Sequence, residues 1–401
     1  MQKTILIISE YFFPEEFKIN EVASDWNQKG YKVTVITRNP TYPHGRIFNG
    51  YKNKWICKDK YNGINIYRVK AVTGYNKSLI KKIFNYLLFM ISGSIISLKI
   101  GRRYNYIFGF NVGSLTGMVP AIILNKYYNK RVVLWIQDIW PDSIYAYGIK
   151  ETKINKTILN YFVRSVYSNT SALAISGRGF EEKIRKYTNV DKNIVYLPNW
   201  ADEFNDKLRP FNFSKKKLIH FTFAGNIGKV QNLENIILAF GKLTKSFSQR
   251  AQLNIIGDGS NFTKLNNLVD QKKYNNIIFW GKKPREDMYM YLQSSDYLIV
   301  SLVDKPIFSV TIPAKVQTYI AAKKPILAII KGDTAKLISE NNLGYCADPE
   351  DINAILESII MCINTDETER EIFVKNSIEL TSTIFNKDDI ISGLLSLTMK
   401  G

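Results

Sequence analysis

The segment that decides the fold reads Leu-Ile-His-Phe-Thr-Phe-Ala-Gly-Asn-Ile-Gly-Lys at residues 218–229. Its first seven residues form an apolar, β-rich run typical of a buried strand in a parallel sheet, and a helix is predicted to start near Asn232. Between them, Gly225 and Gly228 let the backbone approach an anion, the helix N-terminus offers free N–H groups, and Lys229 adds charge. This pattern predicts a phosphate site, although a plain tight turn between strand and helix is the other interpretation.

Two later segments repeat this pattern. Residues 257–259, Gly-Asp-Gly, follow an apolar run at 253–256, and residues 311–315, Thr-Ile-Pro-Ala-Lys, precede another predicted helix. Turns that follow successive parallel strands meet at one edge of a sheet, where ligands of open α/β folds bind. Together the three turns predict that the second half of the chain binds a phosphate-bearing ligand.

Outward from these turns, short β-rich runs alternate with helical stretches along the whole chain. Strands are predicted at residues 5–8, 31–37, 64–70, 106–110, 132–136, 172–175, 194–197, 218–224, 253–256, 277–279, 298–301 and 326–329. This alternation predicts an α/β fold with parallel sheets, and the length suits two domains. The predicted parts are an N-terminal domain at 1–200, a polar linker at 201–217, a C-terminal domain at 218–380 and a final helical segment at 381–401.

The first strand lacks a glycine-rich turn. Residues 11–20 read Tyr-Phe-Phe-Pro-Glu-Glu-Phe-Lys-Ile-Asn, and no glycine precedes Gly30. A dinucleotide-binding fold places a pyrophosphate on glycines at this position. The sequence therefore argues against an NAD enzyme and predicts that the first domain holds something other than the nucleotide.

A second polar segment of the first domain follows a predicted strand. Residues 135–143 read Trp-Ile-Gln-Asp-Ile-Trp-Pro-Asp-Ser. A carboxylate beside two tryptophans suits carbohydrate, because the rings stack on sugar C–H groups and the carboxylate accepts hydrogen bonds from hydroxyls. Capping of the next helix is the alternative role for either aspartate. We assign Asp142 to the cap and Asp138 to function.

Charge is distributed unevenly between the two halves of the chain. Residues 1–200 carry 30 Lys and Arg against 12 Asp and Glu, whereas residues 201–401 carry 25 against 23. A positive field on one half indicates an anionic partner, either nucleic acid or anionic lipid headgroups. A general excess of lysine in the source genome is the alternative explanation, but it accounts less well for the imbalance between the halves.

Cysteine and histidine are scarce. Three scattered cysteines and two histidines leave no disulfide framework, zinc site or histidine-based catalytic triad to expect. The apolar run at 5–8 is too short for a signal peptide, so a cytosolic location is expected.

Residues 83–98 form an uncharged stretch between basic residues, with Lys81 and Lys82 before it and Lys99 after it. A buried helix of the first domain is one interpretation. A helix that dips into the membrane interface, with the basic residues at headgroup level, is another. A true transmembrane span is the third, although about 20 apolar residues are usual for one.

Taken in order, these segments resemble the GT-B glycosyltransferases of family 4, in the branch related to the WbuB-type O-antigen and colanic-acid enzymes. The segments that carry the resemblance across nearly the whole chain are YFFPE (11–15), QDIWPDS (137–143), LPNWAD (197–202), AGNIG with Gln231 and Leu233 (224–233), GDG (257–259) and IPAK with Tyr319 (312–319).

The resemblance implies two Rossmann-like domains that face a central cleft, with a final helix that crosses back to the N-terminal domain. It implies that the C-terminal domain binds a nucleotide-sugar and the N-terminal domain binds the acceptor. Enzymes of this kind retain anomeric configuration by front-face substitution, in which the leaving diphosphate takes the acceptor's proton, and they need no metal ion. Fixed donors that stabilise the diphosphate would supply most of the catalysis.

Residue roles follow from the resemblance and from the motifs above. The predicted catalytic residues are Asp138, which orients the acceptor hydroxyl or the donor sugar, and Lys315, which neutralises the leaving diphosphate. The predicted donor-binding residues are Gly225, Asn226, Gly228, Lys229, Gln231, Gly257, Asp258, Gly259, Pro313, Ala314 and Thr318. The predicted acceptor-binding residues are Glu16, Lys18, Asn20 and Trp140.

The chain departs from the family pattern where charged groups are usual. Asn226 and Gln231 stand where many members have Arg and Lys, so Lys229 and Lys315 are expected to replace those cations. Thr318 stands where a glutamate usually holds the ribose, and its hydroxyl can make only a single-oxygen contact.

The leading hypothesis is a glycosyltransferase of the hexosyl or N-acetylaminosugar class. It would move an amino- or deoxy-sugar from a UDP-sugar, or less readily a GDP-sugar, to a polyprenyl-diphosphate-linked saccharide in O-antigen, capsule or exopolysaccharide synthesis. The basic first domain would hold it peripherally on the anionic inner face of the cell membrane. A nucleotide-sugar epimerase of the same build and an inactive basic scaffold or nucleic-acid-binding protein are the alternatives. Nucleic acid is not an expected partner, because no aromatic platform accompanies a basic stripe.

Overall fold

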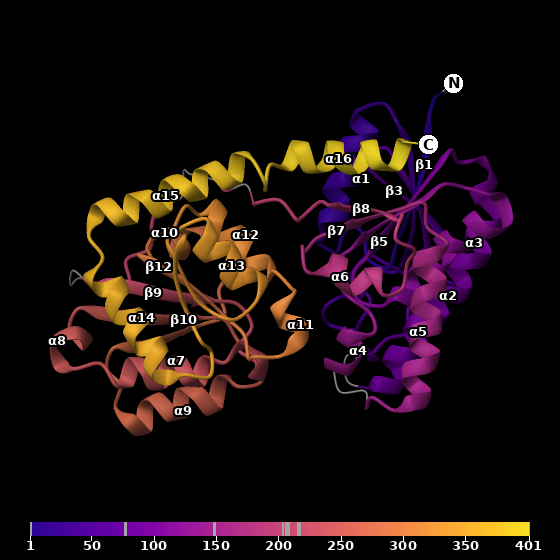
Figure 1. Ribbon diagram of the computed structural model, residues 1–401. Coiled ribbons are helices and arrows are strands. Elements are labelled where there is room, and N and C mark those ends of the chain that lie inside the picture. Colours follow the sequence, from indigo (N-terminus) through magenta and orange to yellow (C-terminus); the bar gives the residue numbers. More distant parts are fainter. Residues whose placement is uncertain are drawn as a thin grey trace. The chain divides into compact units, whose positions relative to one another are not determined.

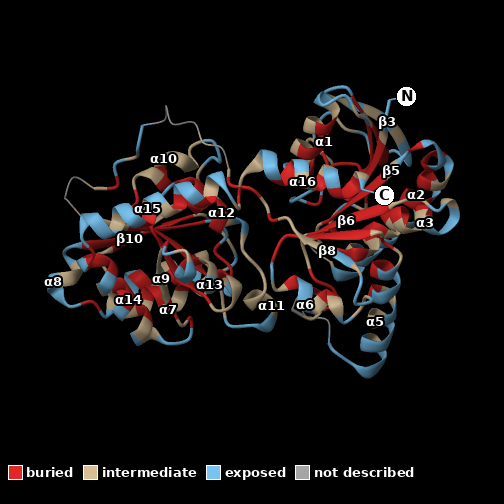
Figure 2. Ribbon diagram, turned by 45° about the horizontal axis from the view of Figure 1, so that its top comes forward, coloured by how far each residue is buried: buried red, intermediate tan, exposed pale blue. Residues whose placement is uncertain are grey.

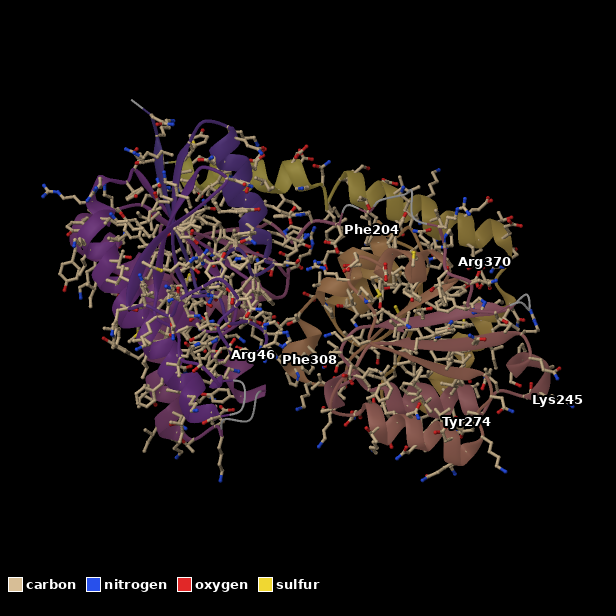
Figure 3. All side chains as sticks on the ribbon, turned by 180° about the vertical axis from the view of Figure 1, so that it is seen from behind. Arg46, Phe204, Lys245, Tyr274, Phe308 and Arg370 are labelled. Carbon is tan, nitrogen blue, oxygen red and sulfur yellow. The ribbon has the colours of Figure 1, made fainter. Side chains whose placement is uncertain are left out.

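The computed structural model describes residues 2–75, 78–146, 150–202, 204, 209–214 and 218–400. The chain divides into two compact units, which we call the N-unit (Met1–Pro198 with Asp388–Gly401) and the C-unit (Asn199–Lys387). The predicted linker at 201–217 therefore groups with the C-unit, and its residues 203, 205–208 and 215–217 lie outside the described residues. Within this segment Phe204, labelled in Figure 3, stacks on Tyr289 of the C-unit with ring centroids 4.5 Å apart.

The N-unit is built on an eight-stranded sheet with the order β3-β4-β2-β1-β5-β6-β7-β8. Neighbouring strands are parallel except β3, which pairs with β4 in an antiparallel hairpin. The strands are β1 (Thr4–Ser9), β2 (Lys32–Arg38), β3 (Ile56–Tyr61), β4 (Ile64–Val69), β5 (Tyr106–Asn111), β6 (Val132–Ile136), β7 (Ala172–Ile175) and β8 (Asn193–Tyr196).

Helices cover both faces of this sheet, as Figure 1 shows. They are α1 (Lys18–Gln28), α2 (Leu79–Ile100), α3 (Val119–Tyr128), α4 (Asp142–Ala146), α5 (Lys153–Ser168), α6 (Phe180–Arg185) and α16 (Lys387–Met399). On one face, Trp26 of α1 packs against Phe108 of β5 and donates a hydrogen bond of 3.4 Å to Ile391 O of α16. The last helix of the chain therefore belongs to the N-unit.

The opposite face of the N-unit sheet carries α2 and α3. Gly109 of β5 faces the short 3-10 turn Leu115–Met118 there, because a Cβ at this glycine would lie 2.8 Å from the sulfur of Met118. Gly93 of α2 lets Pro120 of α3 approach closely. A glycine at such a contact lets two elements approach closely because it has no side chain. One side of α2 therefore packs against the rest of the N-unit.

The C-unit has a six-stranded, fully parallel sheet with the order β11-β10-β9-β12-β13-β14. Its strands are β9 (Ile219–Ala224), β10 (Ala251–Ile256), β11 (Ile277–Gly281), β12 (Tyr297–Ser301), β13 (Ile326–Ile329) and β14 (Gly344–Ala347). Its helices are α7 (Leu233–Gly241), α8 (Lys245–Ser248), α9 (Phe262–Lys272), α10 (Met288–Gln293), α11 (Pro306–Ser309), α12 (Ala314–Ala321), α13 (Asp333–Glu340), α14 (Ile352–Asn364) and α15 (Glu367–Ser382).

Two apolar clusters sandwich the C-unit sheet, which Figure 2 shows as buried strands between helices. One cluster joins the sheet to α7, α9 and α14, and the other joins it to α10, α12, α13 and α15. Strand order reverses between β9 and β12 in this unit, and between β1 and β5 in the N-unit. In doubly wound folds the crevice at such a reversal is the usual ligand site, so the turns after these strands are the ones to inspect.

Candidate functional site

The turns after β9 and β10 in the C-unit are packed against each other. Gly225 and Gly257 have φ values of +139° and +142°, and a Cβ on Gly257 would lie 1.8 Å from the carbonyl oxygen of Gly225. A Cβ on Gly259 would likewise lie 2.5 Å from Ile227 O. Three of the predicted donor-binding glycines are therefore required by the backbone itself, because no side chain fits where two turns meet.

Two predicted donor-binding amides brace the first of these turns. The side-chain oxygen of Gln231 accepts a hydrogen bond of 3.0 Å from Gly228 N, and the Asn226 side chain donates to the same oxygen at 3.3 Å. Lys229 lies between them in a short 3-10 turn and is exposed. Gln231 thus holds the loop in shape, and Lys229 places an exposed positive charge on it.

Lys315 lies at the start of α12 and reaches the turn after β9. Its Nζ atom is buried without a hydrogen-bond partner, 3.8 Å from the centroid of the Phe223 ring and 3.2 Å from where a Cβ on Gly225 would be. Burial lowers the pKa of Lys315 to about 7. The Tyr319 hydroxyl, one turn further along α12, accepts a hydrogen bond from Ala224 N at 3.3 Å and fixes the helix on the strand end.

This arrangement is chemically specific, because an ammonium group buried without an acid costs free energy until an anion pairs with it. The N–H groups of Gly225 and Gly257 donate within the protein, to Ile256 O and Gly281 O at 2.9 Å each. The buried cation at the start of α12, beside turns that carry no bulky side chain, is the feature that suits a phosphate or diphosphate. The predicted set also includes Pro313 and Ala314, which lead into α12, and Asp258, whose carboxylate caps Gly259 N at 2.7 Å.

Thr318 is placed differently from its predicted role. Its hydroxyl donates to the Asp202 carboxylate at 2.6 Å. The proton of this hydroxyl is therefore already in use, and only its oxygen lone pairs are left for a ribose hydroxyl. Thr318 and Asp202 form one polar pair within the C-unit, a partner for Thr318 that the sequence motif did not reveal.

In the N-unit, Asp138 lies just beyond the end of β6. Its carboxylate accepts a hydrogen bond of 2.7 Å from Gly113 N, and burial raises its pKa. The Trp140 indole donates to Gly113 O at 2.9 Å and is only 9% exposed. Both side chains therefore hold the loop after β5, and the Trp140 ring offers no open face for the stacking that an acceptor-binding role predicts. Asp142 is the first residue of α4, and its carboxylate pairs with Lys183 at 2.7 Å. Its capping role stays a prediction.

Among the other predicted acceptor-binding residues, Asn20 is used inside its own loop. It accepts from Phe13 N at 3.0 Å and donates to Glu15 O at 2.7 Å. Glu16 is exposed and Lys18 is half-buried at the start of α1, so both lie at the surface of the N-unit near the end of β1. Their acceptor role stays a prediction.

Two buried charged residues at this edge were not predicted. Glu10 follows β1 directly and Arg38 ends β2, and each is only 1% exposed. A charged residue at the very end of an apolar strand run, as in Ile-Ile-Ser-Glu and Ile-Thr-Arg, is the sequence signal for both. Among the described residues, no group of three or more His, Cys, Asp or Glu side chains is placed to hold a metal ion.

Comparison with known proteins agrees with this geometry. Residues 204–379 match the family described as glycosyl transferases group 1. The chain is 26% identical over 263 residues to the probable glycosyltransferase WbjE of Pseudomonas aeruginosa, covering 61% of this chain and 64% of WbjE, just under two thirds of its length. It is 24% identical over 360 residues to the putative colanic acid biosynthesis glycosyl transferase WcaI of Escherichia coli K12, covering 82% and 84% of the two chains.

Solved structures resemble the whole chain. WaaG, a glycosyltransferase involved in lipopolysaccharide biosynthesis, has a TM-score of 0.66 at 14% identity and covers 99% of this chain and 100% of its own. HepE from Anabaena, solved with UDP and glucose, has a TM-score of 0.65 at 10% identity and covers 98% and 99%.

These similarities define the class of fold and of protein. The chain has the GT-B fold, two Rossmann-like α/β units with parallel sheets, which confirms the predicted fold class. The comparisons support a glycosyltransferase, because residues 204–379 match the group 1 glycosyl transferase family and both relatives are described as glycosyltransferases.

Proposed function

We propose that this glycosyltransferase takes a sugar from a UDP-sugar, or less readily a GDP-sugar, and transfers it with retention to a polyprenyl-diphosphate-linked saccharide. The pathway would be O-antigen, capsule or exopolysaccharide synthesis, in the WbuB-like branch. The names of WcaI and WaaG, with colanic acid and lipopolysaccharide biosynthesis, support the pathway class, and HepE in complex with UDP supports the donor.

The observation that carries the proposal is Lys315. Its buried ammonium has no hydrogen-bond partner among the residues that the structure describes, and it lies beside the glycine turn after β9. A leaving diphosphate would supply the missing counter-charge, and its negative charge grows as the bond to the sugar breaks. Electrostatic stabilisation that increases toward the transition state is the form of binding that raises kcat.

The remaining steps need no side-chain base. In front-face substitution the departing diphosphate oxygen takes the proton of the acceptor hydroxyl as that hydroxyl attacks the anomeric carbon. Asp138, held by Gly113 N, would orient the acceptor hydroxyl or the donor sugar. No metal ion or cofactor is part of this proposal. Lys315 and Lys229 would supply the positive charge that offsets the diphosphate, and main-chain amides would supply hydrogen bonds to it.

Thermal unfolding in the presence of nucleotides tests the donor part. A ligand that binds only the folded protein raises the melting temperature. We expect UDP and UDP-sugars to raise it most, GDP less, and UMP least, with and without a chelator. If no nucleoside diphosphate or its sugar shifts the melting temperature, the proposal is wrong. Product analysis with donor alone would reveal the epimerase alternative, because an epimerase converts the sugar without an acceptor.

The N-unit also presents an apolar surface suited to a membrane. One side of α2 is buried, but a stripe along its other side is exposed: Leu79, Ile80, Ile83, Phe84, Leu87, Ile91 and Ile95, at 39–69% each. Helix α2 is long and apolar enough to cross a membrane by length and composition, yet 44% of its apolar window is buried. Because its inner side packs on the N-unit, we propose that α2 lies in the membrane interface.

A second helix extends this surface. Ile154, Ile158 and Tyr161 of α5 are 62–77% exposed at helical spacing, beside exposed Lys156 and Arg164, and Figure 2 shows most of α5 as exposed. Both α2 and α5 contact the turn Leu115–Met118, so they cover the same face of the sheet. Apolar side chains with cations beside them suit the surface of an anionic bilayer, on the cytoplasmic side of the cell membrane.

Flotation with liposomes tests this surface. We expect wild-type protein to float with phosphatidylglycerol vesicles and less with phosphatidylcholine vesicles. Phe84→Asp combined with Ile91→Asp should weaken binding at least about tenfold, because each apolar side chain contributes about 1.5–3 kcal/mol when fully buried. Met361→Asp, at an equally exposed residue of α14 in the C-unit, is the control. Equal flotation of both variants, or indifference to anionic lipid, would exclude this membrane surface.

A further inference from the structure

Two buried arginines lie on neighbouring strands of the N-unit with contrasting surroundings. Arg38 on β2 and Arg68 on β4 are each 1% exposed, and Arg68 pairs in register with Thr37. Arg68 donates from Nε to the Asp59 carboxylate at 2.8 Å and from Nη2 to Phe13 O at 2.6 Å. Two of its three side-chain nitrogen atoms are therefore used within the protein, and only Nη1 lacks a hydrogen-bond partner among the described residues.

Arg38 has no comparable set of partners. None of its three side-chain nitrogen atoms makes a hydrogen bond within the described part of the chain. The guanidinium lies 3.8 Å from the Glu10 carboxylate and 4.4 Å from the centroid of the Tyr11 ring. Arg38 therefore forms an ion pair with Glu10 and lies against Tyr11, but its hydrogen-bonding capacity is largely unused among the described residues. Buried charged groups are almost always hydrogen-bonded, so such unused capacity suits a polar ligand.

Glu10 shows the same feature from the acceptor side. Both carboxylate oxygens are buried without a hydrogen-bond donor among the described residues. The 3-10 turn Leu115–Met118 leaves room for the Glu10 side chain, because a Cβ on Gly117 would lie 2.7 Å from the Glu10 Cγ. Glu15 lies in the same cluster, but one of its oxygens accepts from Thr41 N and Tyr42 N at 2.8 and 2.7 Å. Glu10 and Arg38 thus form a buried ion pair whose acceptor and donor atoms make no hydrogen bond among the described residues.

Aromatic rings lie over this pair. Tyr11 stacks on Phe17 with centroids 4.8 Å apart, and Tyr42 lies 5.3 Å from both rings. Tyr42 is 45% exposed, whereas Tyr11 is 7% exposed, so the cluster runs from the surface to the buried pair. Aromatic rings that border charged hydrogen-bonding groups are the combination that carbohydrate binding uses.

We propose that Glu10 and Arg38, bordered by Tyr11, Phe17 and Tyr42, form a binding subsite for one sugar ring of the acceptor. A sugar hydroxyl both donates and accepts, so adjacent hydroxyls can donate to Glu10 and accept from Arg38 at the same time. The subsite rests on the proposed function, and it names residues different from the acceptor set that the sequence predicts. Glu10 and Arg38 bind the acceptor and take no part in the chemical step.

Protonation of Glu10 should make saccharide binding at the subsite depend on pH. Burial raises the pKa of Glu10 to about 7, and the charged groups that face it are Arg38 from β2, Glu15 from the loop after β1 and Lys82 from α2. A hydroxyl donates more strongly to the ionised carboxylate than to the protonated acid, so saccharide affinity should rise as the pH increases through about 7 and then level off. A residue with a purely structural role would not produce this profile.

Saccharide binding by saturation-transfer NMR tests the proposal, with a panel of undecyl-diphosphate-linked monosaccharides as the probe. Wild-type protein should bind at least one of them, with the pH profile described above. Arg38→Lys and Tyr42→Ala should weaken binding about tenfold, and Glu10→Gln should also remove the pH dependence. Arg68→Lys is the matched control, because it alters a buried arginine of the same sheet; it should lower the melting temperature and leave saccharide affinity unchanged.

UDP binding, measured on the same samples, separates this proposal from the donor site. If UDP binds but no saccharide binds wild-type protein, or if Arg38→Lys and Tyr42→Ala bind saccharide as wild type does, the subsite is wrong and the donor proposal stands. If saccharide binds as described and UDP does not, the proposed donor function fails instead. The exposed position of Tyr42 ensures that one informative variant folds.

Discussion

The carboxyl edges of the two sheets share a topology but differ in chemistry. In the C-unit the turns after β9 and β10 are rich in glycine, and one buried lysine lies beside them with no hydrogen-bond partner in the described part of the chain. In the N-unit the corresponding edge has no glycine turn after β1 and carries buried acids and an arginine instead. Both edges lie where the strand order reverses, so the fold positions a site in each unit.

The difference shows that the residues directly after the strands, more than the fold, determine what each edge binds. Bare backbone and a cation suit a phosphate, whose oxygens accept only. A carboxylate beside a guanidinium suits hydroxyls, which donate and accept. Under the functions proposed above, the C-unit edge would bind the charged diphosphate of the donor, and the N-unit edge would bind hydroxyl groups of the acceptor sugar.

The largest expected loss of stability comes from a substitution in the glycine turns of the C-unit. Gly257→Ala would place a Cβ 1.8 Å from Gly225 O at a φ of +142°, and it should destabilise the C-unit by at least about 3 kcal/mol. Gly30→Ala in the N-unit, with φ of +88° and nothing within 4 Å, should cost only about 1 kcal/mol. Urea titration with intrinsic fluorescence measures both. Equal costs would show that the two turns do not depend on close packing.

Next in size is the loss of the buried cation. Lys315→Met should lower kcat/KM about 100-fold, about 2.7 kcal/mol, because the leaving diphosphate loses its counter-charge. Lys336→Met on α13 is the control, since it removes a lysine from another part of the C-unit. Turnover at the wild-type rate in Lys315→Met would remove Lys315 from the mechanism.

The pH dependence of stability and of UDP binding gives a second test of Lys315. Its folded pKa of about 7 lies below the ordinary 10.5, so the unfolded chain binds this proton more tightly and stability should rise with pH between those values. UDP needs the protonated amine, so UDP affinity should be full below pH 7 and fall above it. Calorimetric titrations from pH 6 to 9, on wild type and Lys315→Met, compare the two slopes. A wild-type slope that survives in the variant would point to another group.

The sequence predicted the class of fold and the glycine-rich turns of the C-unit because both depend on local pattern. Buried parallel strands read as continuous apolar runs, and glycine pairs mark the turns. The edge strands β3 and β14 are not among the predicted strands. The residues of β3 alternate between exposed and half-buried, and four of its six are charged or Tyr, so no apolar run marks it. Its pairing with β4 is a tertiary effect.

Side-chain roles were harder to predict, because a motif identifies a loop but not the direction of its side chains. Asn20, Gln231 and Trp140 lie in the right loops, yet their polar atoms are used to hold those loops. Glu10 and Arg38 were missed because their significance comes from burial without partners, which only the packed structure reveals. The predictions for the glycines and Lys315 depended on backbone geometry and charge, which can be inferred from residue type without knowing how the side chains pack.

The smallest expected effect concerns the two loop-bracing amides, one in each unit. Asn20→Ala removes hydrogen bonds to Phe13 N and Glu15 O, and Gln231→Ala removes those to Gly228 N and the Asn226 side chain. Each should cost about 1 kcal/mol of stability, measured as a lower urea midpoint, with at most about a threefold change in ligand affinity. A brace acts through the loop, so Gln231→Glu, which keeps the accepting oxygen, should restore stability. A large loss of UDP affinity in Gln231→Ala at unchanged stability would show that this amide contacts the donor directly, and the C-unit edge would then owe its selectivity to side chains as the N-unit edge does.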